Sequence, residues 1–140
     1  MENSRYKFRA WDGKKMFFVN VLNLEDSIAY EDYYWYDGEF SDSTAYGINK
    51  KGVLMQFTGL LDKVGKEIYE SDIVRFSIKG KGKDFKVEEV TWSVEGARFW
   101  FDGYDPYEVM FRNSDVEVIG NIYKHGNLLK KEQRKSRPAK

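Results

Sequence analysis

Two groups of carboxylates are the residues of this chain whose types and spacing are best suited to chemistry. Glu67, Glu70 and Asp72 stand close enough to hold a hard cation, but the Asp-x-Asp-x-Asp pattern of a calcium loop is missing. We therefore expect turn and capping roles for these three. Adjacent Glu88 and Glu89 resemble an acid–base pair, yet neighbours on a regular strand point to opposite faces, which argues against their cooperation.

His125 is the only histidine, and the chain contains no cysteine. Sulfur-ligated metal sites, disulfides and thiolate nucleophiles are thereby excluded, and a serine triad lacks a well-placed base. We expect His125 to be exposed and without a ligand or catalytic role. These residues predict no catalytic site, no metal and no cofactor, and hence a protein that is not an enzyme.

Charge is segregated along the chain although the formal net charge is zero. Residues 16–49 contain seven acidic residues and no Lys or Arg, whereas residues 130–140 contain six basic residues and one acidic residue. A charge asymmetry of this size is a hint about the binding partners of the protein and carries no information about its fold.

An aromatic cluster lies inside the acidic span and consists of Tyr33, Tyr34, Trp35 and Tyr36. The cluster is either part of a core or a protein interface, because Tyr and Trp bury large areas at low entropy cost. An acidic aromatic interface suits a basic protein or a second copy of this chain, and it repels nucleic acid.

Lys79, Lys81 and Lys83 alternate with glycines in a short basic stretch. The composition resembles a phosphate-binding loop, but the Walker spacing is missing and no helix is expected to follow. A solvated hairpin loop is favoured. The alternative is a nucleic-acid contact, with exposed Trp92 or Trp100 available for base stacking.

The elements of the first half are expected to be strands. Residues 6–11 and 16–22 flank an Asp-Gly turn and predict a hairpin. Residues 23–36 fit a helix or a strand, and their aromatic content favours a strand. Residues 41–52 are polar and rich in small side chains, which predicts a boundary or a mobile loop.

The second half carries further strand patterns. Residues 53–57 predict a short strand and residues 62–66 a turn, with Gly65 in the left-handed conformation. Apolar residues alternate with polar ones from Val74 to Ile78, which is typical of a half-buried strand. The alternation changes phase near Glu88–Glu89, where we expect a β-bulge.

Short strands at regular spacing, one bulge and no convincing helix predict a small antiparallel barrel or sandwich. We expect three segments: an N-terminal hairpin and acidic aromatic segment at 1–52, a β-barrel at 53–129, and a disordered basic tail at 130–140. No apolar run is long enough to span a membrane, and the lack of cysteine fits a cytoplasmic protein.

Three stretches carry a resemblance to a known family: Lys7-Phe8-Arg9-Ala10-Trp11-Asp12, the run LMQFTGLLDKVGKEIYESDIV from Leu54 to Val74, and Val118-Ile119-Gly120-Asn121-Ile122-Tyr123. Together they resemble the YopX protein family of bacteriophages and prophages of Gram-positive hosts. The resemblance covers about residues 5–129 and implies a β-rich fold with an SH3-like barrel in the second half, to which the N-terminal β-hairpin is an extension. It implies no activity and no site residues. Ser71 stands where the family usually has glycine, and a positive φ there would cost about 1 kcal/mol relative to glycine.

The sequence therefore predicts a phage or prophage accessory protein that is not an enzyme and acts by contact with itself or with a host or phage protein. The alternative is a nucleic-acid-binding module that uses the Lys/Gly loop and the basic tail. No membrane partner is expected.

Overall fold

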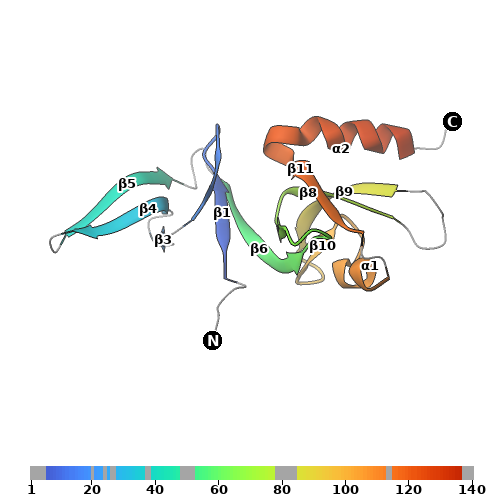
Figure 1. Cartoon of the computed structure of the whole chain (residues 1–140), viewed down its shortest axis with the longest axis horizontal. Coiled ribbons are helices and arrows are strands. Elements are labelled where there is room, and N and C mark those ends of the chain that lie inside the picture. The colour runs from blue at the N-terminus through green and yellow to red at the C-terminus, as the bar shows by residue number, and fades with distance from the viewer. Residues whose placement is uncertain are drawn as a thin grey trace. The chain divides into compact units, whose positions relative to one another are not determined.

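The computed structural model describes residues 6–19, 21–23, 25, 28–36, 39–47, 53–77, 85–112 and 115–136. In this part of the chain the fold is mainly β, with antiparallel strand pairs in three sheets and two helices in the second half (Figure 1). The chain divides into two compact units, Met1–Phe57 and Thr58–Lys140. The boundary between them falls inside strand β6 (Val53–Leu61). The three segments expected from the sequence stay a prediction.

In the first unit, β1 (Phe8–Trp11) and β2 (Met16–Phe18) form the hairpin that the Asp-Gly turn predicted. Gly13 has a φ of 103°, and the Asp12 carboxylate accepts hydrogen bonds from the backbone N–H groups of Lys14 and Lys15 at 2.7 and 2.8 Å. The start of β6 pairs with the other edge of β1.

Beyond β2, the described strands of the acidic span form a second sheet of the first unit. Its strands are β3 (Val21–Asn23), β4 (Ile28–Tyr36) and β5 (Glu39–Gly47), in that order, so β5 is an edge strand. The preference for a strand at 28–36 is confirmed. The expected loop is wrong for residues 41–47, because the long register between β4 and β5 pairs this polar segment despite its weak strand propensity. Residues 48–52 lie outside the described residues.

The second unit is built on the sheet β10-β9-β8-β11, which curls into a half-barrel. Its strands are β8 (Asp72–Ser77), β9 (Phe85–Ser93), β10 (Arg98–Phe101) and β11 (Glu117–Asn121), and β7 (Glu67–Tyr69) pairs with β6. One face of the curled sheet covers a compact core made of Ile68, Val74, Phe76, Val90, Phe101, Val109, Val116 and Val118. The predicted alternation along β8 is confirmed, since Val74 and Phe76 are buried while Arg75 between them is exposed.

The bulge expected near Glu88–Glu89 is wrong. The register of β9 runs without a break from Phe85 to Glu89 against β8 and from Val90 to Ser93 against β10. The change of phase arises because the strand is buried on both faces. Val90 belongs to the core, while Val87 is buried on the opposite face, where helix α2 packs against β8, β9 and β11. The sheet does contain an irregularity, between Val118 and Gly120 of β11.

Two helices were not predicted. Helix α1 (Pro106–Arg112) begins after Asp105, whose carboxylate accepts a hydrogen bond from Tyr107 N–H at 2.9 Å, and proline suits the first helical position. Helix α2 (Ile122–Ser136) contains a break at His125. It includes residues 130–136, where a disordered tail was expected; Lys, Glu, Gln and Arg are good helix formers and extend a helix that is already packed on the sheet. No helix in the described part of the chain is long and apolar enough to cross a membrane.

Candidate functional site

The sequence predicted two binding surfaces, the aromatic cluster and the Lys/Gly loop, and the structure does not describe the side chains of either one. Tyr33, Tyr34, Trp35 and Tyr36 belong to β4, whose backbone pairs with β5, but their side chains are not among those described. Lys79, Lys81 and Lys83 lie outside the described residues, in the connection between β8 and β9. Both surfaces stay predictions.

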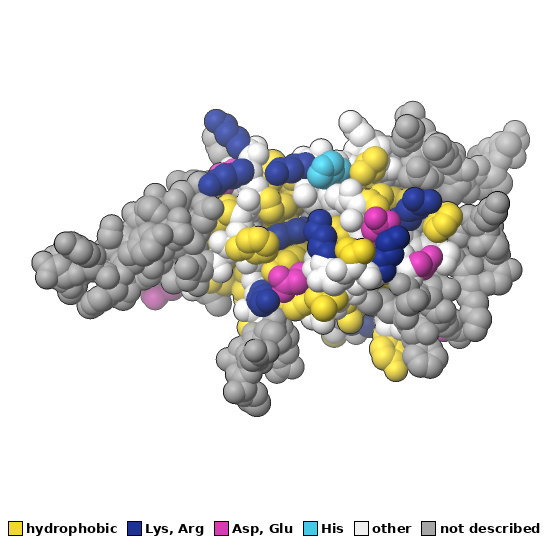
Figure 2. Space-filling model, in the orientation of Figure 1, with side chains coloured by type: hydrophobic (Ala, Val, Ile, Leu, Met, Phe, Trp, Pro, Cys, Tyr) yellow, Lys and Arg dark blue, Asp and Glu magenta, His cyan; other side chains and the backbone are white. Residues whose placement is uncertain are grey.

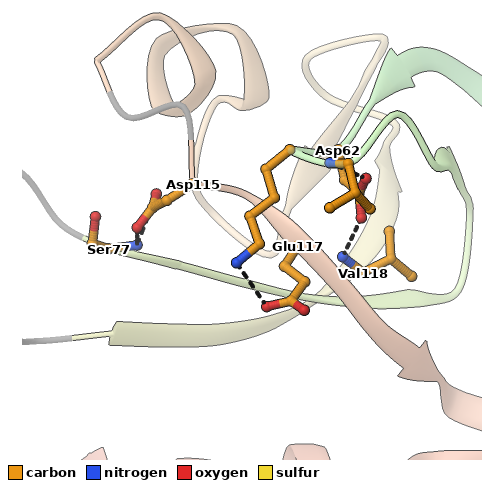
Figure 3. Close-up of polar contacts among 7 residues, drawn as sticks. Asp62, Ser77, Asp115, Glu117 and Val118 are labelled. Carbon is orange, nitrogen blue, oxygen red and sulfur yellow. Dashed lines mark hydrogen bonds and ion pairs between the residues drawn. The ribbon is translucent and has the colours of Figure 1, made fainter.

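Asp62 is the centre of a hydrogen-bond network that the sequence did not predict. Its side chain is buried, with 7% of the residue exposed. One carboxylate oxygen accepts hydrogen bonds from Val64 N–H and Lys66 N–H at 3.0 and 2.8 Å, and the other accepts from Val118 N–H at 3.0 Å. Figure 3 shows the bond from Asp62 to Val118, which joins the turn after β6 to β11.

The electrostatics of Asp62 follow from these contacts. Burial pushes the pKa of its carboxyl upward, but the three backbone N–H donors and the charge of Lys66 outweigh burial and hold the pKa below its ordinary value. The carboxylate therefore stays ionised and stabilises the turn that the sequence predicted here. Gly65 has a φ of 85°, which confirms the predicted left-handed residue.

The turn between β7 and β8 is held in a similar way. Ser71 has a φ of 69°, so the position that usually holds glycine in the resembled family does require the left-handed conformation. Its N–H donates to the carbonyl of Val90 at 2.8 Å, and its carbonyl accepts from Ile122 N–H at 3.0 Å. Asp72 is buried and accepts a hydrogen bond from Tyr69 N–H at 2.8 Å, which confirms the turn role expected for this carboxylate.

The junction between β11 and α2 explains the third stretch of the resemblance. The Asn121 side chain caps α2 by accepting hydrogen bonds from Tyr123 N–H and Lys124 N–H at 3.1 and 3.0 Å. Nδ1 of His125 accepts a hydrogen bond from Asn121 N–H at 3.2 Å. The imidazole lies so close to Gly120 that a Cβ atom there would come within 2.7 Å of it. His125 is exposed, as expected, and it has a structural role, although the sequence did not predict its contacts with Gly120 and Asn121.

The middle stretch therefore contacts each of the other two. Ala10 pairs with Leu54, Asp62 binds the N–H of Val118, and Ser71 binds the N–H of Ile122. Figure 3 shows two further contacts of the second unit: Lys63 forms an ion pair with Glu117 at 3.2 Å, and Ser77 N–H donates to the Asp115 carboxylate at 3.2 Å. We call the side chains and backbone groups of Asp62, Ser71, Asp72, Gly120, Asn121 and His125 the turn network.

Glu88 and Glu89 do not form the pair that their adjacency suggested. They point to opposite faces of β9, and Glu88 interacts instead with Asp102 in the turn after β10. The pKa of Glu88 is raised to about 7, first by burial and then by the Asp102 carboxylate, against a lowering by Lys86. The pKa of Glu89 is also raised, first by burial and then by Asp102.

A carboxyl group that exchanges its proton near neutral pH is able to act as a general acid or base. The described charged neighbours of Glu88 are one carboxylate, Asp102, and one lysine, Lys86. No group of three or more His, Asp or Glu side chains among the described residues is arranged to hold a metal ion. The Glu88–Asp102 contact is an electrostatic feature of the fold.

The exposed side chains with binding potential are aromatic residues and arginines of β8, β9 and β10. The Arg75 guanidinium lies 4.1 Å from the ring centroid of Phe85, and that of Arg98 lies 5.7 Å from the ring centroid of Trp100. Trp92 is 48% exposed. In Figure 2, Lys and Arg side chains are interspersed with hydrophobic ones over the described surface that faces the viewer. Such a mixed surface suits a protein or an anionic partner.

Comparison with known proteins identifies a family and two similar solved structures. The sequence model of the family described as YopX protein matches residues 7–130. The structure is similar to the crystal structure of protein EF1440 from Enterococcus faecalis, with a TM-score of 0.65 and 27% identity over 88% of this chain and 96% of that chain. It is also similar to protein yopX from Bacillus subtilis, with a TM-score of 0.56 and 21% identity over 89% of this chain and 98% of that chain. No curated protein matches the chain. The family match extends over most of the sequence and includes all three stretches, so the chain belongs to the YopX protein family.

Proposed function

We propose that this protein is a phage or prophage accessory protein, located in the bacterial cytoplasm, that binds other proteins or further copies of itself and catalyses no reaction. In this proposal the half-barrel of the second unit is an SH3-like barrel, and the N-terminal hairpin extends it. The barrel serves as a rigid support for binding surfaces, and neither a metal nor a cofactor takes part.

One observation carries the proposal. The side chains of the family stretches that have suitable chemistry, Asp62, Asp72 and Asn121, are occupied by backbone N–H groups. Hydrogen-bonding capacity spent on turns and caps is not available for a substrate. The described surface also presents arginines beside aromatic rings, Arg75 at Phe85 and Arg98 at Trp100, and such side chains are enriched at the energetic centres of protein interfaces.

We place the main interface on the acidic aromatic segment, at Tyr33, Tyr34, Trp35 and Tyr36 of β4. The segment lies in a hairpin of two nine-residue strands, which gives a long platform for contact. Its seven acidic residues favour a basic protein surface and oppose nucleic acid.

Size-exclusion chromatography with light scattering tests the proposal on the full chain. Tyr34→Ala and Trp35→Ala should each weaken self-association by about 2 kcal/mol, the usual scale for aromatic side chains at the centre of an interface. Tyr107→Ala is the matched control, because Tyr107 is 75% exposed in the second unit. A protein that is monomeric at every concentration would remove self-association. Tight binding of single-stranded DNA that is lost when Lys79, Lys81 and Lys83 are changed to Ala would make nucleic acid the better assignment.

A further inference from the structure

The two arginine–aromatic pairs lie on one face of the curled sheet. Phe85 pairs with Ser77, Arg75 with Val87, Trp100 with Thr91 and Arg98 with Ser93, so all four side chains share the face opposite the core. Helix α2 packs on part of this same face, but Arg75 and Phe85 stay exposed. We call Arg75, Phe85, Arg98 and Trp100 the arginine–aromatic face.

Arg75 is the residue of this face that has donors to offer. Its guanidinium is exposed and lies over the Phe85 ring at 4.1 Å, and Phe85 is itself 45% exposed. A ring beneath the guanidinium fixes its plane and leaves the N–H edge free for a carboxylate, which arginine binds with two parallel hydrogen bonds.

The acidic residue that stands opposite Arg75 across the sheet is already engaged elsewhere. Glu117, opposite Arg75 in the β11–β8 register, forms an ion pair with Lys63 at 3.2 Å. Arg98 has an ion-pair partner, since its guanidinium donates a hydrogen bond to the Asp105 carboxylate at 2.8 Å. Within the described part of the chain, Arg75 has an aromatic contact and no ion pair.

The chain itself supplies a segment of the complementary charge. Residues 16–49 hold seven carboxylates and no Lys or Arg. Two of these acids, Glu39 and Asp42, belong to β5, which is the edge strand of its sheet and has one strand partner. Edge strands without Lys or Pro are open to association, and β5 contains neither residue.

We propose that the arginine–aromatic face of one copy receives the acidic β4–β5 hairpin of a second copy, with Arg75 as the main carboxylate-binding residue and Glu39 or Asp42, which stand on opposite faces of β5, as its partner. This inference rests on the proposed function and names the partner surface. In the proposed function, Tyr33–Tyr36 supply the aromatic contacts of the interface. The inference adds charged contacts, which determine the surface of the second copy that this hairpin binds.

Charge exchange between copies tests this proposal. Sedimentation or light scattering is used to measure self-association of the full chain at low and at 0.5 M salt. Arg75→Glu should weaken association at least tenfold at low salt, and Glu39→Lys with Asp42→Lys should do the same. Combining all three changes should restore most of the lost association, because the opposed charges are exchanged. Lys14→Glu, an exposed residue of the β1–β2 turn with the same change of charge, should have less than a twofold effect.

The outcomes separate this inference from the proposed function. Circular dichroism and melting curves confirm that each variant is folded. Wild-type association that Arg75→Glu leaves unchanged, but Trp35→Ala weakens, would overturn the assigned face and keep protein contact. Failure of the combined variant to recover association would also overturn the pairing, as would a wild-type protein that is monomeric at every concentration. Binding of single-stranded DNA that is lost in Arg75→Glu would assign the face to nucleic acid instead.

Discussion

Asp62 and Glu88 are two carboxyl groups of the second unit that respond to partial removal from water in opposite ways. Asp62 accepts hydrogen bonds from three backbone N–H groups, and its pKa lies below the ordinary value. Glu88 meets another carboxylate, Asp102, and its pKa is raised to about 7. Burial acts in the same direction on both groups, so the local donors decide the difference.

The comparison separates two kinds of position in this fold. Asp62 belongs to a stretch that identifies the family, and its burial is fully compensated by turns that close the half-barrel. Glu88 belongs to the region between those stretches, where its charge is poorly compensated. The family stretches therefore contain the residues that hold the turns of the second unit. The strands between them, β9 and β10, carry carboxyl groups such as Glu88 whose charge has no such hydrogen-bond donors among the described residues. Four substitutions test this distinction, in order of decreasing effect.

Asp62→Ala should cause the largest loss, about 3 kcal/mol of unfolding free energy, because it leaves three backbone N–H groups without their acceptor. Asp12→Ala is the matched control: Asp12 accepts two backbone N–H groups in an exposed turn, and its loss should cost about 1 kcal/mol or less. Urea unfolding at pH 7 measures both. Equal losses of unfolding free energy would show that burial of the Asp62 carboxylate adds nothing to its contribution to stability.

The same pair predicts an acid response. The folded pKa of Asp62 lies below its ordinary value of 3.8, so its stabilisation is complete above that value and is lost as the pH falls through the folded pKa. Wild-type protein should lose stability on acidification below about pH 4, and Asp62→Ala should lose less over the same range. Parallel curves would contradict this assignment.

Gly120→Ala should cost about 2 kcal/mol, because the new Cβ would lie 2.7 Å from the His125 ring. His125→Ala should recover part of this loss when the two changes are combined, which a double-mutant cycle measures as a coupling between them. A purely additive pair would mean that the imidazole does not hold the β11–α2 junction.

Glu88→Gln should raise stability at pH 8 by about 1 kcal/mol, a value reduced for the partial exposure of the group. The folded pKa of about 7 exceeds the ordinary 4.5, so the protonated form stabilises the fold below about pH 4.5 and this contribution is lost as the pH rises through 7. Urea unfolding at pH 5 to 8 should therefore give a flatter curve for the variant. Glu95→Gln, in the exposed turn after β9, should leave the slope unchanged.

Ser71→Gly should have the smallest effect, a gain of about 0.5–1 kcal/mol, because glycine adopts a φ of 69° without strain. Ser71→Ala serves as the control, since it removes the hydroxyl but keeps the Cβ. The thermal midpoint should rise for the glycine variant alone. A lower midpoint for Ser71→Gly would show that the backbone at this position is not strained.

Local patterns predicted much of the fold. The Asp-Gly hairpin, the left-handed Gly65 and the alternation of Val74 and Phe76 are short-range signals, and the structure confirms them. The helices were missed because their caps, Asp105 and Asn121, precede sequences with weak apolar periodicity. The bulge at Glu88–Glu89 was wrong because burial on two faces imitates a change of register.

The site was less predictable than the fold. The backbone N–H groups that donate to Asp62 and Ser71 come from residues as far along the chain as Val118 and Ile122, and no local pattern reveals such contacts. Asp62 and Gly65 together predicted a turn, but nothing in the local sequence predicted that the Asp62 side chain would be buried. Trp92 and Trp100 were considered as exposed rings, whereas the stacking of Arg75 on Phe85 depends on the pairing of β8 with β9.

Native-state hydrogen exchange at three backbone amides tests most directly whether the family stretches close the fold. The N–H groups of Val118, Ser71 and Ile122 donate to acceptors in other parts of the second unit. We predict that they exchange only when the whole unit unfolds, with the same free energy as urea unfolding. The amides of Lys14 and Lys15, in an exposed turn, should exchange through local opening at a much lower free energy. Exchange of the Val118 amide as fast as that of Lys14 would contradict the account.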